Sequence, residues 1–141
     1  LSRLISIKLY VNEKRVATYS CDGLIVSTPA GTTAHSLSAG GPIVTPDMEA
    51  FAITPICPHT LSNRPLVVSG SSKIEMEQIS ESKGVGLTVD GQVYFEVKAG
   101  DRIVIEKAEK KLQLIDTQTR TFYDVLREKL NWRGQPAYDV N

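Results

Sequence analysis

The sequence predicts a mainly β fold, a sandwich or barrel-like domain of many short antiparallel strands. Three observations support this prediction. Apolar and polar residues alternate through residues 4–11, with the period of a half-buried strand. Short strand-like runs recur at close, even spacing between residues 66 and 115. Turn signals separate these runs, above all Asp90-Gly91, the strongest short-range hairpin signal in the chain.

The first elements are expected to form a hairpin. Residues 4–11 are its first strand, residues 12–14 its turn and residues 15–21 its second strand. Residues 24–27 continue extended up to Pro29, which lacks an N–H and disfavours helix in the residue before it. A strand therefore leads directly into the next segment.

That segment, DGLIVSTPAGTTAHSLSAGGPIVTP at residues 22–46, combines glycine with small hydroxyl residues. We expect a tight turn and a short helix that begins near Thr32 or Thr33 and ends before Gly40. Glycine lets a backbone approach a ligand closely, and hydroxyls at a helix start can bond phosphate or ribose oxygens. The segment lacks both the P-loop lysine and the G-x-G-x-x-G spacing of dinucleotide folds.

The remaining elements are mostly strands. Residues 51–57 are apolar but contain Pro55, which predicts an edge or irregular strand, and an ordered loop follows at residues 59–65. Ala99-Gly100-Asp101 marks a turn. Further strands are expected at residues 66–68, 73–79, 85–89, 93–97, 102–106 and 111–115.

A helix is predicted over residues 121–130, capped by Thr121 or Thr119. Its apolar residues recur at helical spacing on one face, more typical of core or subunit contact than of a cofactor site: Phe122, Val125, Leu126 and Leu130.

Composition indicates one ordinary globular domain, with 141 residues, 41% hydrophobic and 23% charged. Lysine plus arginine balance aspartate plus glutamate at 16 each, so nothing favours nucleic acid. There is no apolar run of about 18 residues, so we expect no membrane association and a cytoplasmic location. Cys21 and Cys57 stand apart from metal-ligand spacing, and we expect both to be reduced, buried and structural.

Two long segments resemble the NAD kinase family. Its pattern DGLI-[IV]-[SA]-T-P-x-G-[ST]-T-A-Y-S-L-S-A-G-G-P-I is matched by Asp22-Gly23-Leu24-Ile25, Ser27-Thr28-Pro29, Gly31, Thr33-Ala34 and Ser36-Leu37-Ser38-Ala39-Gly40-Gly41-Pro42-Ile43. A second family segment recurs at residues 53–67. The resemblance extends over nearly the whole chain, to near Trp132.

This resemblance implies the C-terminal NAD-binding β-sandwich of an enzyme that transfers phosphate from ATP to the 2′-hydroxyl of the adenosine ribose of NAD, giving NADP. It assigns NAD binding to Asp22, Thr33, Ala34, His35, Ser36, Leu37, Ser38 and Gln92, and more weakly to Arg3, Ser20, Ala30 and Gly91. A carboxylate can accept from a ribose hydroxyl or carboxamide N–H₂, and hydroxyls can hold polar ligand edges.

The chain departs from the family at two positions. His35 stands where the family usually has Tyr, which reduces aromatic packing on the ligand, and Ala30 replaces a common Thr or Ser. The family's Gly-Gly-Asp-Gly-Thr motif, with its general-base Asp, has no counterpart here. We therefore expect a piece of a longer enzyme, cut away from its α/β catalytic domain and inactive alone.

The resemblance also implies partners for the full enzyme: NAD or NADP, ATP or another phosphoryl donor, Mg²⁺ or another divalent metal, and further copies of itself in a homo-oligomer. Two alternatives stay open. One is a related lipid kinase of the diacylglycerol or sphingosine type, against which the run Thr33 to Ser38 argues. The other is a β-sandwich interaction module without chemistry, which would bind no nucleotide.

Overall fold

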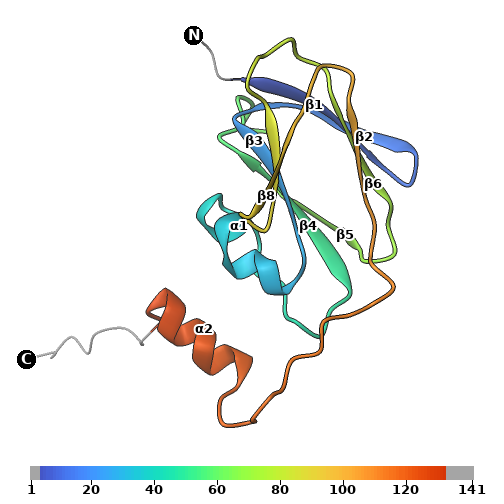
Figure 1. Cartoon of the computed structure of the whole chain (residues 1–141). Coiled ribbons are helices and arrows are strands. Elements are labelled where there is room, and N and C mark those ends of the chain that lie inside the picture. Colours follow the sequence, from blue (N-terminus) through green and yellow to red (C-terminus); the bar gives the residue numbers. More distant parts are fainter. Residues whose placement is uncertain (1–3, 133–141) are drawn as a thin grey trace, which may run out of the picture. The chain divides into compact units, whose positions relative to one another are not determined.

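The computed structural model describes residues 4–132, which divide after Ala108 into two compact units. Figure 1 shows the elements. The first unit contains, in chain order, β1 (Ile5–Val11), β2 (Lys14–Cys21), β3 (Gly23–Ser27), the 3₁₀ turn η1 (Ala30–Thr33), α1 (His35–Ser38), β4 (Ala50–Ile56), β5 (Leu66–Ser69), β6 (Ile74–Gln78), β7 (Gly86–Val89), β8 (Val93–Glu96) and β9 (Arg102–Ile105). The second contains α2 (Phe122–Leu130).

All strand pairs within the described residues are antiparallel, and they form three sheets. The strand order is β2-β1-β6-β9 in the first sheet and β3-β4-β5 in the second, while β7 and β8 form a separate hairpin. The second sheet is inserted between β2 and β6 in the sequence. The mainly β prediction is confirmed.

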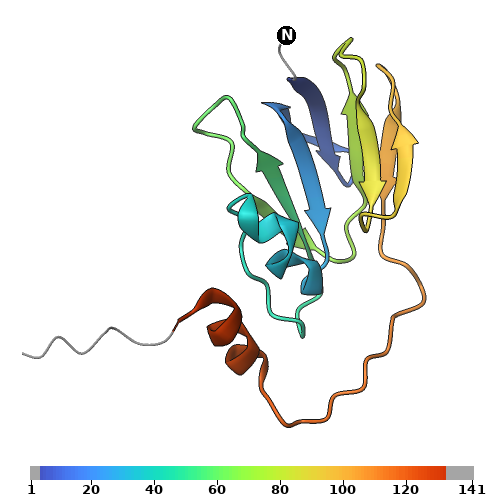
Figure 2. The same ribbon diagram turned by 60° about the vertical axis from the view of Figure 1, so that its left-hand side comes forward.

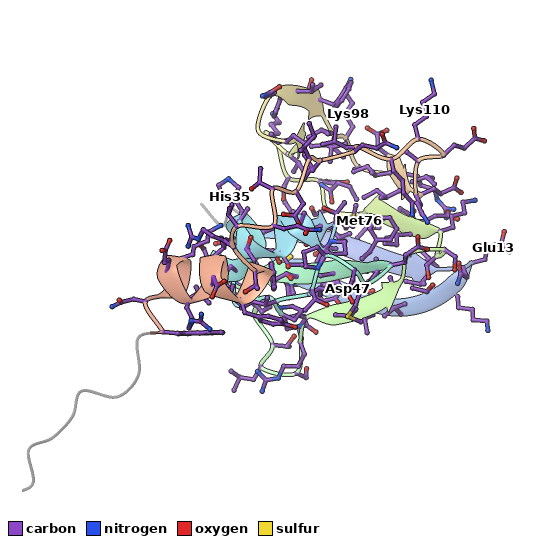
Figure 3. All side chains as sticks on the ribbon, turned by 90° about the horizontal axis from the view of Figure 1, so that it is seen from below. Glu13, His35, Asp47, Met76, Lys98 and Lys110 are labelled. Carbon is purple, nitrogen blue, oxygen red and sulfur yellow. The ribbon has the colours of Figure 1, made fainter. Side chains whose placement is uncertain are left out.

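The two larger sheets face each other across the hydrophobic core, as Figure 2 shows from the side. Alternation explains the core, because every second side chain of a strand points to the same face. Figure 3 shows Met76 inside the unit. The buried core residues are Ile7, Leu9, Tyr19, Cys21, Phe51, Ile53, Ile74 and Met76.

The expectation of an edge or irregular strand at Pro55 is wrong. β4 is the central strand of its sheet, and Pro55 is buried and pairs with Leu24 of β3. The ladder between β4 and β5 ends at Ile53, two residues before the proline. Its missing N–H therefore removes no bond from that ladder, which is how a central strand accommodates it.

The expected strand at residues 111–115 is also wrong. The segment forms no strand, and Leu112, Leu114 and Ile115 are 87%, 80% and 96% exposed. A strand requires a neighbour with a free edge, and none of the sheets within residues 4–132 takes this segment up. Alternating apolar residues without such a neighbour stay extended and exposed.

The C-terminal helix begins as expected at the cap Thr121. The Thr121 hydroxyl accepts from the Asp124 N–H at 3.1 Å, and the Asp124 carboxylate accepts from the Thr121 N–H at 2.8 Å, forming a capping box. The hydrogen bond from the Thr121 backbone, and next the one with the Thr121 side chain, hold the pKa of Asp124 below its ordinary value. The charged carboxylate is therefore part of the cap.

The two cysteines differ from each other. Cys21 is fully buried and free, as expected, and burial raises the pKa of its thiol, with a further contribution from the nearby Asp22 charge. Cys57, expected to be buried, is exposed, because it follows the end of β4 with a left-handed φ of 45°. No helix among the described residues is long and apolar enough to cross a membrane.

Candidate functional site

The segment from η1 to α1 lies over the outer face of the β3-β4-β5 sheet (Figure 2). Phe51 and Ile53 of β4 point into the core, so Ala52 and Thr54 between them point to the other face. Ala52 is nevertheless only 1% exposed and Thr54 fully buried. The helical segment therefore covers this face and has a buried side of its own.

The expected single helix is divided in two by Ala34. η1 ends at Thr33, Ala34 adopts φ −99° and ψ −130°, and α1 then makes one turn from His35 to Ser38. No Gly or Pro marks this break. The break lies inside the candidate binding segment and determines which of its residues face outward.

Two buried hydroxyl side chains hold the segment in place, Thr32 through the flanking loops and Ser36 through β4. The Thr32 hydroxyl is fully buried, donates to the Pro29 carbonyl at 2.6 Å and accepts from the Val44 N–H at 3.1 Å. Four residues later Ser36 is 1% exposed, and its hydroxyl lies 3.0 Å from that of Thr54 on β4. The Ser36 hydroxyl is thus bonded inside the unit, although the sequence suggested it as a ligand contact.

Gly41 lies directly against the Ser36–Thr54 pair. Its N–H donates to the Ser36 carbonyl at 2.8 Å. A Cβ at this position would lie 2.3 Å from the Ser36 hydroxyl and 2.6 Å from the Thr54 hydroxyl. Only glycine leaves room for the two hydroxyls to meet, so this glycine is required for space and not for an unusual backbone conformation.

The other residues of the segment are accessible from outside the unit. Figure 3 shows His35 on the outside of α1. Thr33 is half-buried, with its hydroxyl 3.4 Å from the Ala30 carbonyl, and Leu37 is also half-buried. The exposed members are Ala30, Ala34, His35 and Ser38.

Ser20 and Asp22 lie near the same end of β4. The Asp22 N–H donates to the Ile56 carbonyl at 2.9 Å, and the His59 N–H donates to the Ser20 carbonyl at 2.9 Å. Both Ser20 and Asp22 are exposed. Ile56 is two residues beyond Thr54, about 7 Å along the strand, so Asp22 and α1 are attached to neighbouring positions of one strand.

Gly91 and Gln92 lie elsewhere in the fold, in the turn of the β7–β8 hairpin. Asp90 and Gly91 have φ of 51° and 68°, and the Gln92 N–H donates to the Val89 carbonyl at 3.1 Å. Gly91 and Gln92 are exposed. Arg3, another predicted site residue, lies outside the described residues.

Three residues that shape this region are not among the binding residues predicted from the sequence: Thr32, Gly41 and Thr54. Thr54 is a single hydroxyl in an otherwise apolar strand, so its spacing carries no signal for a site. Within residues 4–132 there is no group of three or more His, Cys, Asp or Glu side chains that could hold a metal ion.

The profile of the ATP-NAD kinase C-terminal domain matches residues 1–117. The chain is 50% identical over 133 residues to an NAD kinase of Desulforamulus reducens and 48% identical over 132 residues to one of Geotalea daltonii. Each alignment includes 94% of this chain and 46% of the relative. The chain thus spans about half the length of the curated relatives it matches.

Two solved structures are similar to the chain. Yeast NADH kinase complexed with NADH has a TM-score of 0.68 and 40% identity, covering 72% of this chain and 29% of that one. An NAD kinase from Archaeoglobus fulgidus in complex with ATP has a TM-score of 0.68 and 38% identity, covering 75% and 40%.

Proposed function

Since the chain belongs to the ATP-NAD kinase C-terminal domain family, we propose that it is the NAD-binding part of an NAD kinase. The full enzyme transfers the terminal phosphate of ATP to the 2′-hydroxyl of the adenosine ribose of NAD, and NADP is the product. The outward side of the η1–α1 segment carries this proposal. It presents small polar groups, and the exposed carboxylate of Asp22 is attached to a neighbouring position of β4.

Each group has a role that suits its chemistry. The Asp22 carboxylate accepts a hydrogen bond from a ribose hydroxyl or the carboxamide N–H₂ of NAD. Thr33 and Ser38 offer hydroxyls, and Ala34 and Leu37 offer backbone groups and apolar surface. His35 stacks on the ligand or donates a hydrogen bond from its imidazole.

Other contacts belong to the same proposal. Gln92 and Gly91 approach the ligand from the β7–β8 turn, and Ser20, Ala30 and Arg3 contribute at its margin. Ser36 supports the site without touching the ligand through its hydroxyl, because that hydroxyl is buried and bonded to Thr54.

The chemical step needs groups beyond this chain. The sequence contains no Gly-Gly-Asp-Gly-Thr motif, so the general base belongs to the other part of the full enzyme. Phosphoryl transfer relies on positioning the nucleophile and on offsetting phosphate charge. We assign the positioning of NAD to this chain and ATP with Mg²⁺, or another divalent metal, to the full enzyme, which we propose to be a cytoplasmic homo-oligomer.

Calorimetric titration of this chain with NAD and NADP tests the proposal. We expect saturable binding, which Asp22→Ala weakens by about 1 to 3 kcal/mol through loss of a hydrogen bond to the ligand. Asp47→Ala is the matched control, since Asp47 is also exposed but lies in a different loop. No saturable binding by the folded chain would contradict the proposal and favour an interaction module, and equal affinities of both variants would remove Asp22 from the site.

A further inference from the structure

We propose that Thr54 is a positioning residue of the NAD site. Its hydrogen bond to Ser36 fixes the orientation of α1. This inference rests on the proposed function. Thr54 lies on β4, beneath the segment, and touches no exposed surface, because it is fully buried. Its effect on the ligand is therefore exerted through α1.

A one-turn helix cannot hold its own orientation. α1 has four residues, and isolated helices of even a dozen residues are marginal in water. The orientation of α1 must therefore come from contacts with the sheet. Ser36 is its only buried residue, so the Ser36–Thr54 contact is the principal side-chain attachment of this turn.

The attachment is directional. One of these two buried hydroxyls donates to the other at 3.0 Å, and moving either one would break this bond inside the unit. An apolar contact at the same place would permit rotation, since apolar packing has no preferred angle. Gly41 confines the pair further, because its N–H holds the Ser36 carbonyl and its missing side chain leaves the space that the hydroxyls occupy.

Rotation of this turn would change the ligand surface. Successive residues of a helix are about 100° apart, so a turn displaced by one residue exchanges an inward with an outward side chain. His35 and Ser38 lie outward only while Ser36 points to Thr54. The hydroxyl pair thus selects which side chains of α1 meet NAD.

The test compares Thr54→Val, which keeps the shape of the side chain but not its hydroxyl, with Thr54→Ser, which keeps the hydroxyl. We expect Thr54→Val to bind NAD about tenfold more weakly and Thr54→Ser to stay within about twofold of the wild type. We also expect faster amide hydrogen exchange at Gly41 and Ala39 in Thr54→Val without ligand, because their N–H groups bond to carbonyls of α1.

A control variant separates positioning from general loss of stability. Ile74→Val removes one methyl group from the core and lowers the stability of the same unit. We expect it to keep wild-type NAD affinity. Equal weakening in Ile74→Val and Thr54→Val would overturn the proposal, as would unchanged NAD affinity in a folded Thr54→Val.

The outcomes also distinguish this inference from the proposed function. A folded wild-type chain without NAD binding would refute the proposed function and, with it, the role of Thr54. Wild-type binding with an unaffected Thr54→Val would refute the role of Thr54 alone. In the double variant Ser36→Ala/Thr54→Val, we expect an NAD affinity no lower than that of Thr54→Val, since both changes remove the same contact.

Discussion

Gly41→Ala should destabilise the first unit strongly, although the change adds a single methyl group. The added carbon would lie 2.3 Å from the Ser36 hydroxyl, 2.6 Å from that of Thr54 and 2.8 Å from the Ser36 carbonyl. Even weak C–H contacts to oxygen occur at about 3.3 Å. The hydroxyl pair must therefore separate or the backbone of residue 41 must shift.

The size of the effect follows from these contacts. Overpacking a close-fitting interior costs about 1 to 3 kcal/mol, and separation of the buried hydroxyl pair adds about 1 kcal/mol or more. The reduced freedom of the unfolded chain returns about 0.4 to 1 kcal/mol. We expect the free energy of unfolding to fall by about 1 to 4 kcal/mol, and the melting temperature by roughly 4 to 25 °C.

Urea unfolding followed by circular dichroism measures this change, with Gly31→Ala as the control. A Cβ at Gly31 would have its nearest neighbours at 3.4 Å, and the φ of both glycines lies outside the left-handed region, so only the overlap differs. We expect Gly31→Ala to remain within about 1 kcal/mol of the wild type. If both variants lose the same stability, the hydroxyl pair does not restrict this position.

Three further predictions concern other parts of the chain. The Cβ of Gly86→Ala would lie 2.1 Å from the Tyr94 ring, but that ring is 63% exposed and can rotate away. We therefore expect this variant to change the free energy of unfolding in urea by less than about 0.5 kcal/mol. A large loss would show that the ring is fixed. Burial, and next the Cys21 charge, raise the pKa of Tyr19, so the unfolded chain loses its phenol proton first and the free energy of unfolding should fall above pH 10, by at most about 1.4 kcal/mol per pH unit. Urea unfolding between pH 8 and 11 should show a shallower decline in Tyr19→Phe, and identical slopes would contradict this. Thr121→Ala should weaken the cap of α2 by about 0.5 to 2 kcal/mol and reduce helicity by circular dichroism, whereas unchanged helicity would mean that the capping box is dispensable.

Local signals predicted the local elements of this fold. The alternation in residues 5–11 specifies β1, and Asp90-Gly91 supplies the two positive φ angles that the β7–β8 turn requires. The sequence likewise offers Thr121 and Thr119 as caps, and Thr121 is the one that forms the capping bonds. In each case the determining interactions lie within a few residues of each other.

The errors occurred where distant contacts decide the outcome. Pro55 is compatible with a central strand because the β4–β5 ladder ends at Ile53, and the extent of that ladder cannot be inferred from the residues around the proline. Residues 111–115 have a strand pattern, but no pattern supplies the neighbouring edge. The resemblance predicts which residues around α1 contact the ligand. It does not predict that Thr54 supports α1, because this contact depends on β4 packing against α1.

The insertion of β3, β4 and β5 between the strands of the first sheet has a consequence for biosynthesis. β1 pairs with β2 at once, but its other edge pairs with β6, which follows β2 after about 50 residues. At translation rates of about 5 to 20 residues per second, that edge waits roughly 3 to 10 s for its partner on the ribosome. Such long-range pairing also slows refolding in vitro. Until β6 emerges, the β1–β2 hairpin therefore has an unpaired edge that is accessible to a chaperone.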